Sequence, residues 1–310
     1  MNASLPRMLT PTLALLALAA VVAGCGKSVS AGSSASGHGA LQVVAAENFW
    51  GSIAGQLAGD RATVKSIIVN PSTDPHSYEP NAQDARTIAG AKMAIANGVG
   101  YDNWMTQDLA ASPSSGRVVL DVGRLLGLRQ GDNPHVWYSP SAVYRVIDAI
   151  VADYDRLDPA ASAYFAQRKQ ALESHGLARY NLLRQQIRSR YKGVAVGYSE
   201  SIFAPLGQAL GLKLLTPYSF AKAIAEGTDV SAQDKQTVDR QARNHEIKLW
   251  VYNSQNVTPD VQRVTSIIDA QHIRVTTVTE TLSPASASFQ QWQVGELERL
   301  AAALHQATGR

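Results

Sequence analysis

From residue 41 onward the chain alternates between short apolar runs and longer segments whose apolar residues recur at helical spacing. Three runs in the first half have the length and β-branched content of buried strands: LQVVAAE (41–47), ATVKSIIV (62–69) and RVVLDVG (117–123). FWGSIAGQLAG (49–59) has the spacing of a helix, and DARTIAGAKMAIANG (84–98) that of a helix followed by a strand. Strands that alternate with helices predict a parallel sheet covered by helices on both faces.

The second half of the chain repeats this alternation. Strands are predicted at GVAVGYS (193–199), KLWVYN (248–253) and IRVTTVTE (273–280). Helical segments lie between them, and FQQWQVGELERLAAALHQATG (289–309) is a final helix. We therefore expect an α/β protein with two lobes of similar size, the first at residues 41–157 and the second at residues 191–310.

A long helical segment separates the two lobes. Ser139 and Pro140 are a favourable helix start, because serine is a good N-cap and proline fits the first helical position. The sequence Asp158-Pro159 breaks this helix and begins another, which continues to about residue 190 with one glycine and no further proline. About 30 helical residues span about 45 Å. Residues 158–190 are therefore predicted to form one long, rigid helix that links the lobes.

The first 24 residues have the pattern of a signal peptide. Arg7 is their only charge, and the apolar run that starts at residue 9 is shorter than a typical membrane span. The run ends in VAGC, which resembles a bacterial lipobox, so we expect Cys25 to carry lipid and to anchor the protein outside the cytoplasm. The alternative is an ordinary secretory signal with an unrelated cysteine. Residues 25–40 are rich in glycine and serine and are expected to be a tether.

Composition and motifs exclude several classes of function. The chain has 310 residues, 45% hydrophobic and 17% charged, with a net charge of +3, and its basic residues are scattered rather than grouped in a stripe for nucleic acid. Cys25 is the only cysteine, so no disulfide can form within the chain. NHEIKL (244–249) lacks the second histidine of a zinc-protease helix, and GYSES (197–201) lacks the second glycine of a nucleophile elbow. No enzyme signature is strong.

Two histidines lie in proline-rich loops of similar chemistry. His76 lies in PSTDPHSYEP (71–80) and His135 in NPHVWYSP (133–140), and each loop follows a predicted strand. Prolines restrict the backbone of both loops, and ligands of parallel sheets bind at the carboxyl ends of strands. A matched pair of this kind predicts a metal site as an alternative to two solvated side chains. The neighbouring aromatic residues Tyr78 and Trp137 either pack beside that site or belong simply to the core.

The second lobe offers carboxylates at two strand ends. Glu200 follows GVAVGYS, and Glu280 ends IRVTTVTE. Two carboxylates would neutralise a divalent ion held by two imidazoles. Taken alone, however, each glutamate has the simpler interpretation of a charge at a helix start or in a loop.

The stretches DPHSYEP, NPHVWYSP, YSESIF and TVTETL…FQQWQ resemble the metal-binding lipoproteins of bacterial ABC importers for zinc and manganese. This family includes the zinc-uptake binding proteins and the manganese-binding streptococcal adhesins. The resemblance covers residues 41 to about 305. It implies two α/β lobes that clamp one ion through four ligands, here His76, His135, Glu200 and Glu280. It also implies a binding protein that is not an enzyme, carries zinc or manganese as cargo, delivers it to a membrane permease, and works as a lipid-anchored monomer.

Three departures from the family pattern affect this interpretation. Asn133 stands where the family usually has aspartate, and Glu280 stands where aspartate is usual, so its longer side chain must bind differently or its loop must retreat. No histidine lies between His76 and His135, where many zinc members have a His-rich loop. Two imidazoles with two carboxylates suit manganese, but they also bind zinc, so the choice of metal stays open.

A second function class is a metallohydrolase outside the cytoplasm. Its zinc would be held by His76, His135 and Glu200, with an open fourth position for the attacking water. Glu280 separates the two hypotheses, because a fourth protein ligand closes the position that the water needs.

Overall fold

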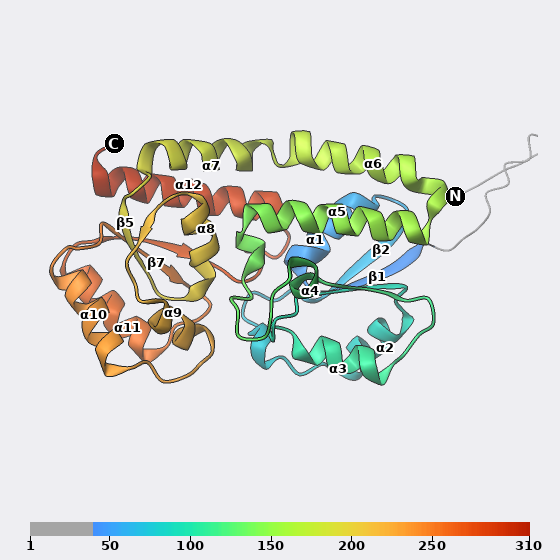
Figure 1. Ribbon diagram of the computed structural model, residues 1–310, viewed down its shortest axis with the longest axis horizontal. Helices are drawn as coiled ribbons and strands as arrows, with labels where there is room; N and C mark the ends of the chain where they lie inside the picture. Colours follow the sequence, from blue (N-terminus) through green and yellow to red (C-terminus); the bar gives the residue numbers. More distant parts are fainter. Residues whose placement is uncertain (1–39) are drawn as a thin grey trace, which may run out of the picture. The chain divides into compact units, whose positions relative to one another are not determined.

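The structure is a computed structural model that describes residues 40–310. The predicted signal peptide, Cys25 and residues 26–39 of the expected tether lie outside the described residues. Residues 40–310 lie in one compact unit that contains two parallel sheets (Figure 1). Among residues 40–310, none of the helices combines the length and apolar character needed to cross a bilayer.

The first sheet has four parallel strands in the order β2-β1-β3-β4. Alternate residues of β1 point to two separate cores, which explains its continuous apolar run: Val43 and Ala45 pack with α1, whereas Val44 and Ala46 pack with α2 and α3. The strands are β1 (Leu41–Glu47), β2 (Ala62–Ile68), β3 (Met93–Ala96) and β4 (Val118–Asp121). The helices are α1 (Asn48–Ala58), α2 (Ala82–Gly90), α3 (Asn103–Ala111) and α4 (Val122–Leu126).

The second sheet repeats the same strand order, β6-β5-β7-β8, again with all strands parallel. Its strands are β5 (Ala195–Tyr198), β6 (Lys213–Leu214), β7 (Leu249–Asn253) and β8 (Arg274–Val278). Its helices are α8 (Ala204–Ala209), α9 (Tyr218–Ala225), α10 (Ala232–Arg243), α11 (Pro259–Ala270) and α12 (Phe289–Thr308). The prediction of two α/β lobes with parallel sheets is confirmed. Candidate ligands follow the carboxyl ends of strands in both lobes: His76 follows β2, Glu200 follows β5 and Glu280 follows β8.

The segment between the lobes is helical, as predicted, but it is not one uniform α-helix. After α5 (Pro140–Leu157) the chain forms a 3-10 turn at Pro159–Ala161, then α6 (Ser162–Ala171) and α7 (Ala178–Tyr191). A π-helical turn at Leu172–Gly176 joins the last two, and Leu177 N donates to Leu172 O at 2.8 Å. Leu172 and Gly176 are tightly packed there, since a Cβ atom at residue 176 would lie 3.0 Å from Leu172 Cδ1.

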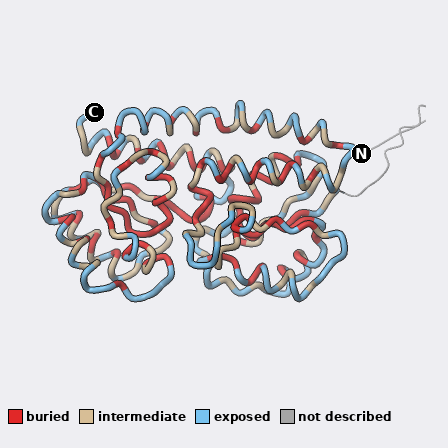
Figure 2. Tube along the Cα trace, viewed as in Figure 1, coloured by how far each residue is buried: buried red, intermediate tan, exposed pale blue. Residues whose placement is uncertain are grey.

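The two lobes share one continuous hydrophobic core, which Figure 2 shows as buried strands and inner helix faces. Helix α12 lies along α7 and reaches back to the first lobe (Figure 1). Phe289 N at its start donates to Ser52 Oγ of α1 at 2.9 Å, and Gln290 exchanges hydrogen bonds with Gln56. The last helix of the second lobe is therefore fastened to the first helix of the first lobe.

Candidate metal centre

Three of the four candidate ligands, His76, Glu200 and Glu280, lie in loops that follow β2, β5 and β8. The prediction that the loop of His135 follows a strand is wrong, because helix α4 lies between β4 and that loop. His76 is in the 3-10 turn Pro75–Ser77 after β2, where Asp74 Oδ1 accepts a hydrogen bond from His76 N at 2.9 Å. His135 immediately precedes the 3-10 turn Val136–Tyr138. Glu200 lies two residues beyond the end of β5, and Glu280 two residues beyond the end of β8. Proline and the Asp74 cap explain why so short a loop can hold His76 in a defined conformation.

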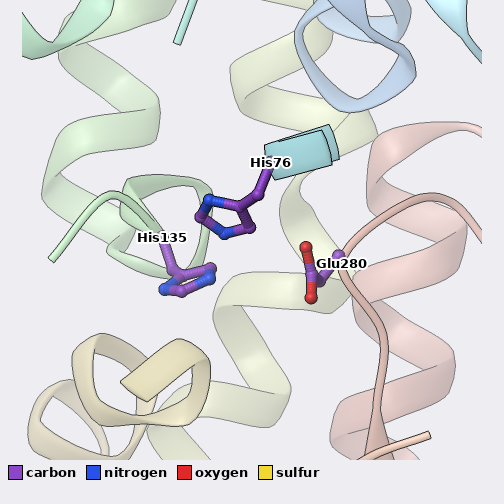
Figure 3. A group of neighbouring side chains, drawn as sticks. All are labelled: His76, His135 and Glu280. Atoms are coloured by element: carbon purple, nitrogen blue, oxygen red, sulfur yellow. The ribbon is translucent and has the colours of Figure 1, made fainter. Parts of the chain in front are cut away.

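The structure brings these residues together from both lobes. His76, His135 and Glu280 each offer a ligand atom within 4.8 Å of the others, and Figure 3 shows their side chains facing one another. Glu200 is not part of that group of three, but its Oε1 lies 3.5 Å from His135 Nε2. His76 is exposed, whereas the other three are buried, so His76 lies on the solvent side of the cluster.

Asn133 orients the ring of His135. Asn133 Oδ1 lies 2.7 Å from His135 Nδ1 and can accept a hydrogen bond only if that nitrogen carries the hydrogen. His135 Nε2 then keeps its lone pair and faces Glu200. The amide of Asn133 also donates to Ser201 O of the second lobe at 2.8 Å. Asn133 therefore supplies the acceptor that orients the ring of His135 and adds a contact across the lobes.

Asn253 holds the two carboxylates side by side. Asn253 Nδ2 donates to Glu200 Oε2 and to Glu280 Oε1, each at 2.8 Å. Asn253 itself is fully buried and is the last residue of β7. Tyr101 Oη donates to Glu280 Oε2 at 2.9 Å. Both oxygens of Glu280 are thus fixed from two sides, so its longer side chain still reaches the histidine pair.

Burial dominates the electrostatics of the cluster. Burial raises the pKa of Glu200, which the nearby Glu280 raises further, and burial likewise raises the pKa of Glu280. Burial lowers the pKa of His135, and burial lowers the pKa of His76 against the opposing effect of Asp74. Desolvation therefore favours uncharged side chains here, and a cation among them would remove that penalty for the carboxylates.

Two buried atoms of the cluster have no hydrogen-bond partner. These atoms are His135 Nε2 and Glu200 Oε1, in side chains that are fully buried and 3.5 Å apart. A deprotonated imidazole nitrogen and a carboxylate oxygen are both acceptors, so they can lie face to face only around a proton or a cation. Nitrogen and oxygen donors in this arrangement fit a divalent transition metal.

Aromatic side chains surround the histidines, but not quite as the sequence suggested. Trp137 is buried beside His135, with ring centroids 5.2 Å apart. Tyr78 instead packs on Trp104 and donates to Asp84 at 2.7 Å, so it belongs to the core behind the loop. Tyr101 lies against His76, at 4.6 Å between ring centroids. The sequence motifs do not include Tyr101 and Asn253, although Tyr101 lies in the loop after β3 and Asn253 ends β7, so both lie near the carboxyl end of a strand.

His76 lines two cavities. One, of about 340 Å³, is lined by Asn133, Ser201 and Tyr218, and the other, of about 380 Å³, by Asp74, Gln255 and Glu280. His76 and Glu226 line both. Solvent therefore reaches the cluster past His76.

Residues 43–303 match the family model described as zinc-uptake complex component A, periplasmic. The chain is 29% identical over 164 residues to the manganese-binding lipoprotein MntA of Halalkalibacterium halodurans, which is 51% of this chain and 52% of that protein. It is 23% identical over 168 residues, 48% of this chain, to the high-affinity zinc uptake system protein ZnuA of Bacillus subtilis, of which 52% is covered. The chain thus spans about half the length of these curated relatives.

Solved structures match over a longer stretch. The SBP FpvC from Pseudomonas aeruginosa in complex with Mn2+ has a TM-score of 0.70 and 20% identity, covering 87% of this chain and 100% of that one. A periplasmic metal binding protein from Candidatus Liberibacter asiaticus has a TM-score of 0.69 and 19% identity, covering 84% and 98%. At these identities the matches establish the fold.

Proposed function

Since the chain belongs to the family of periplasmic zinc-uptake complex components, we propose that it is a solute-binding protein that captures a divalent transition metal between its lobes. It delivers this cargo, zinc or manganese, to the permease of an ABC importer in the membrane. The ligands are His76, His135, Glu200 and Glu280. The protein is a carrier and not an enzyme, and it works as a monomer.

One observation carries this proposal. His135 Nε2 and Glu200 Oε1 are buried, without hydrogen-bond partners, and face each other across the lobes. His76 and Glu280 each offer a ligand atom within 4.8 Å of one another and of one on His135, so that with Glu200 the donor set would be two imidazoles and two carboxylates. Glu280 also weighs against the metallohydrolase alternative, because it lies where such an enzyme needs an open position for water. Neither the matching family nor the two relatives named above are described as hydrolases.

The donor set leaves zinc and manganese as candidates. Carboxylate oxygens suit manganese, whereas imidazole nitrogens favour zinc, and zinc binds more tightly than manganese to most such sites. One relative is described as a manganese-binding lipoprotein and another as a zinc uptake protein. Competition between the two ions is therefore part of the test.

Elemental analysis of the protein purified without added metal tests the proposal. We expect one zinc or manganese ion per chain, and we expect H76A and H135A to lose it. H175A is the matched control, because His175 is an exposed histidine in the π-helical turn, away from the cluster. If H76A and H135A both bind zinc and manganese as tightly as the wild type, the proposed site is wrong.

The organisation of the chain around this site is also part of the proposal. Residues 1–24 are a signal peptide, Cys25 carries the lipid, and residues 25–40 tether the lobes to the membrane. The first lobe is residues 41–157, the linking segment residues 158–190, and the second lobe residues 191–310. The VAGC sequence supports the anchor, and so does the description of one relative as a lipoprotein.

Membrane fractionation tests the anchor. We expect C25A to move from the membrane fraction to the soluble fraction, whereas a serine-to-alanine change in the tether, S30A, leaves the protein in place. Unchanged membrane retention of C25A would contradict the lipid anchor.

A further inference from the structure

Glu296 is a buried acid of α12 that has no part in the proposed ligand set. Glu296 is 2% exposed, and it takes part in none of the ion pairs among residues 40–310. Its Oε1 accepts hydrogen bonds from Thr279 N at 2.9 Å and from Trp292 Nε1 at 3.1 Å. Its Oε2 lies 2.5 Å from Tyr138 Oη. A charged or polar group enclosed in this way must be paired by its neighbours.

The number of hydrogens available for hydrogen bonds in this cluster identifies the protonation state of Glu296. Tyr138 Oη also lies 2.8 Å from the carbonyl oxygen of Thr279, and a phenol has one hydrogen to donate. If Tyr138 donates to a carboxylate, its oxygen meets the Thr279 carbonyl with no hydrogen between them. If Glu296 carries a proton on Oε2, it donates to Tyr138, and Tyr138 donates to Thr279. With a neutral acid, a hydrogen lies in both short contacts of Tyr138 Oη, the one with Glu296 Oε2 and the one with the Thr279 carbonyl oxygen. With a carboxylate, one of these two contacts has no hydrogen.

The surroundings of Glu296 agree with this count. Burial raises the pKa of Glu296 to about 7, whereas its hydrogen bond with Tyr138 and the positive charge of Arg299 on the same helix act in the opposite direction.

The two partners of Glu296 belong to the loops of two proposed ligands. Tyr138 ends the 3-10 turn that begins directly after His135, in the first lobe. Thr279 directly precedes Glu280, in the second lobe. Glu296 therefore contacts both loops at once, through Tyr138 and Thr279.

We propose that Glu296, in its protonated form, is a positioning residue that ties the His135 turn to the Glu280 loop and so sets the spacing of the metal donors. This inference rests on the proposed function, because the role of Glu296 is measured as a change in metal affinity. Metal–ligand distances are short, about 2.0–2.3 Å, so a small displacement of either loop weakens binding. Changes to residues that orient metal ligands typically lower metal affinity about 10- to 100-fold.

Four variants test this role. E296Q keeps an acceptor for Thr279 and Trp292 and a donor for Tyr138, as the neutral acid does, so we expect its zinc affinity to stay within about threefold of the wild type. E296A and Y138F break the chain of hydrogen bonds, and we expect each to lower zinc affinity about 10- to 100-fold.

L304A is the control for stability alone, because Leu304 is buried two turns further along α12. It should lower the melting temperature and leave the affinity unchanged.

The measurements are zinc affinity by competition with a chelator, melting temperature, and the infrared difference spectrum of wild type minus E296Q. We expect that spectrum to contain the carbonyl stretch of a protonated carboxyl group. If E296A does not fold, Y138F and E296Q carry the test.

Three results would overturn the inference: E296Q as weak as Y138F, an affinity of Y138F within about threefold of the wild type, or no protonated carboxyl signal. H135A distinguishes this failure from failure of the proposed function. If H135A loses zinc while Y138F keeps it, metal capture stands and the positioning role falls. If H135A keeps zinc, the proposed function itself is wrong.

Discussion

Asn253 offers a sharp test of how the second lobe arranges its carboxylates. Its side-chain amide donates to Glu200 Oε2 and to Glu280 Oε1, both at 2.8 Å, in a fully buried position. Replacement by leucine, N253L, keeps the number of side-chain heavy atoms and removes both donors. The two carboxylates would then face each other without the group that separates and orients them.

The magnitude follows from these two hydrogen bonds. A hydrogen bond to a charged group contributes about 1.5–3 kcal/mol, so the pair represents about 3–6 kcal/mol. Both the metal-free and the metal-bound protein lose these bonds, and protonation relieves part of the loss in the metal-free form. The loss is therefore larger in the metal-bound than in the metal-free protein, and this difference lowers the metal affinity. We expect a decrease of about 10- to 100-fold, as for other residues that orient metal ligands. That range corresponds to about 1.4–2.7 kcal/mol.

Competition with a chelator measures the loss for zinc and for manganese. N181L is the matched control, because Asn181 of α7 donates to Tyr144 Oη of α5 at 2.7 Å and contacts none of the proposed ligands. We expect weaker binding of both ions by N253L and wild-type binding by N181L. An affinity of N253L within about threefold of the wild type, less than about 0.7 kcal/mol, would refute the role of Asn253.

Three further outcomes are expected. E200H should shift the preference in competition from manganese toward zinc, because imidazole is the softer donor, and an unchanged ratio would remove Glu200 from the ligand set. The pKa of Glu296 rises on folding from 4.5 to about 7, so its proton stabilises the folded state fully below pH 4.5 and progressively less as pH rises through 7. Chemical denaturation should show this loss for the wild type and not for E296Q; parallel curves would contradict it. Metal loading should leave the lobes nearly in place, because they share one core, and scattering that shows a wide closure would count against this.

Local sequence was enough to predict the lobes and the loops of the site. Strand and helix periods, the prolines beside His76 and His135, and the strand-end places of Glu200 and Glu280 depend on neighbouring residues alone. Such short-range signals also predicted helix across the linking segment. They did not predict its π-helical turn, which forms where Gly176 packs closely on Leu172.

Tertiary structure alone decided which side chains meet and what charge they carry. Tyr101 and Glu280 are 179 residues apart, and Tyr138 and Glu296 are 158 apart, yet each pair is hydrogen-bonded. Tyr78 looked equivalent to Trp137 in the sequence, but packing turned it toward Trp104. Burial and hydrogen-bond partners from distant loops set the pKa of a buried acid, and neither has a signal in the local pattern. The local sequence therefore determined in which loops the four proposed ligands lie, and the packing of the two lobes determined which side chains come together.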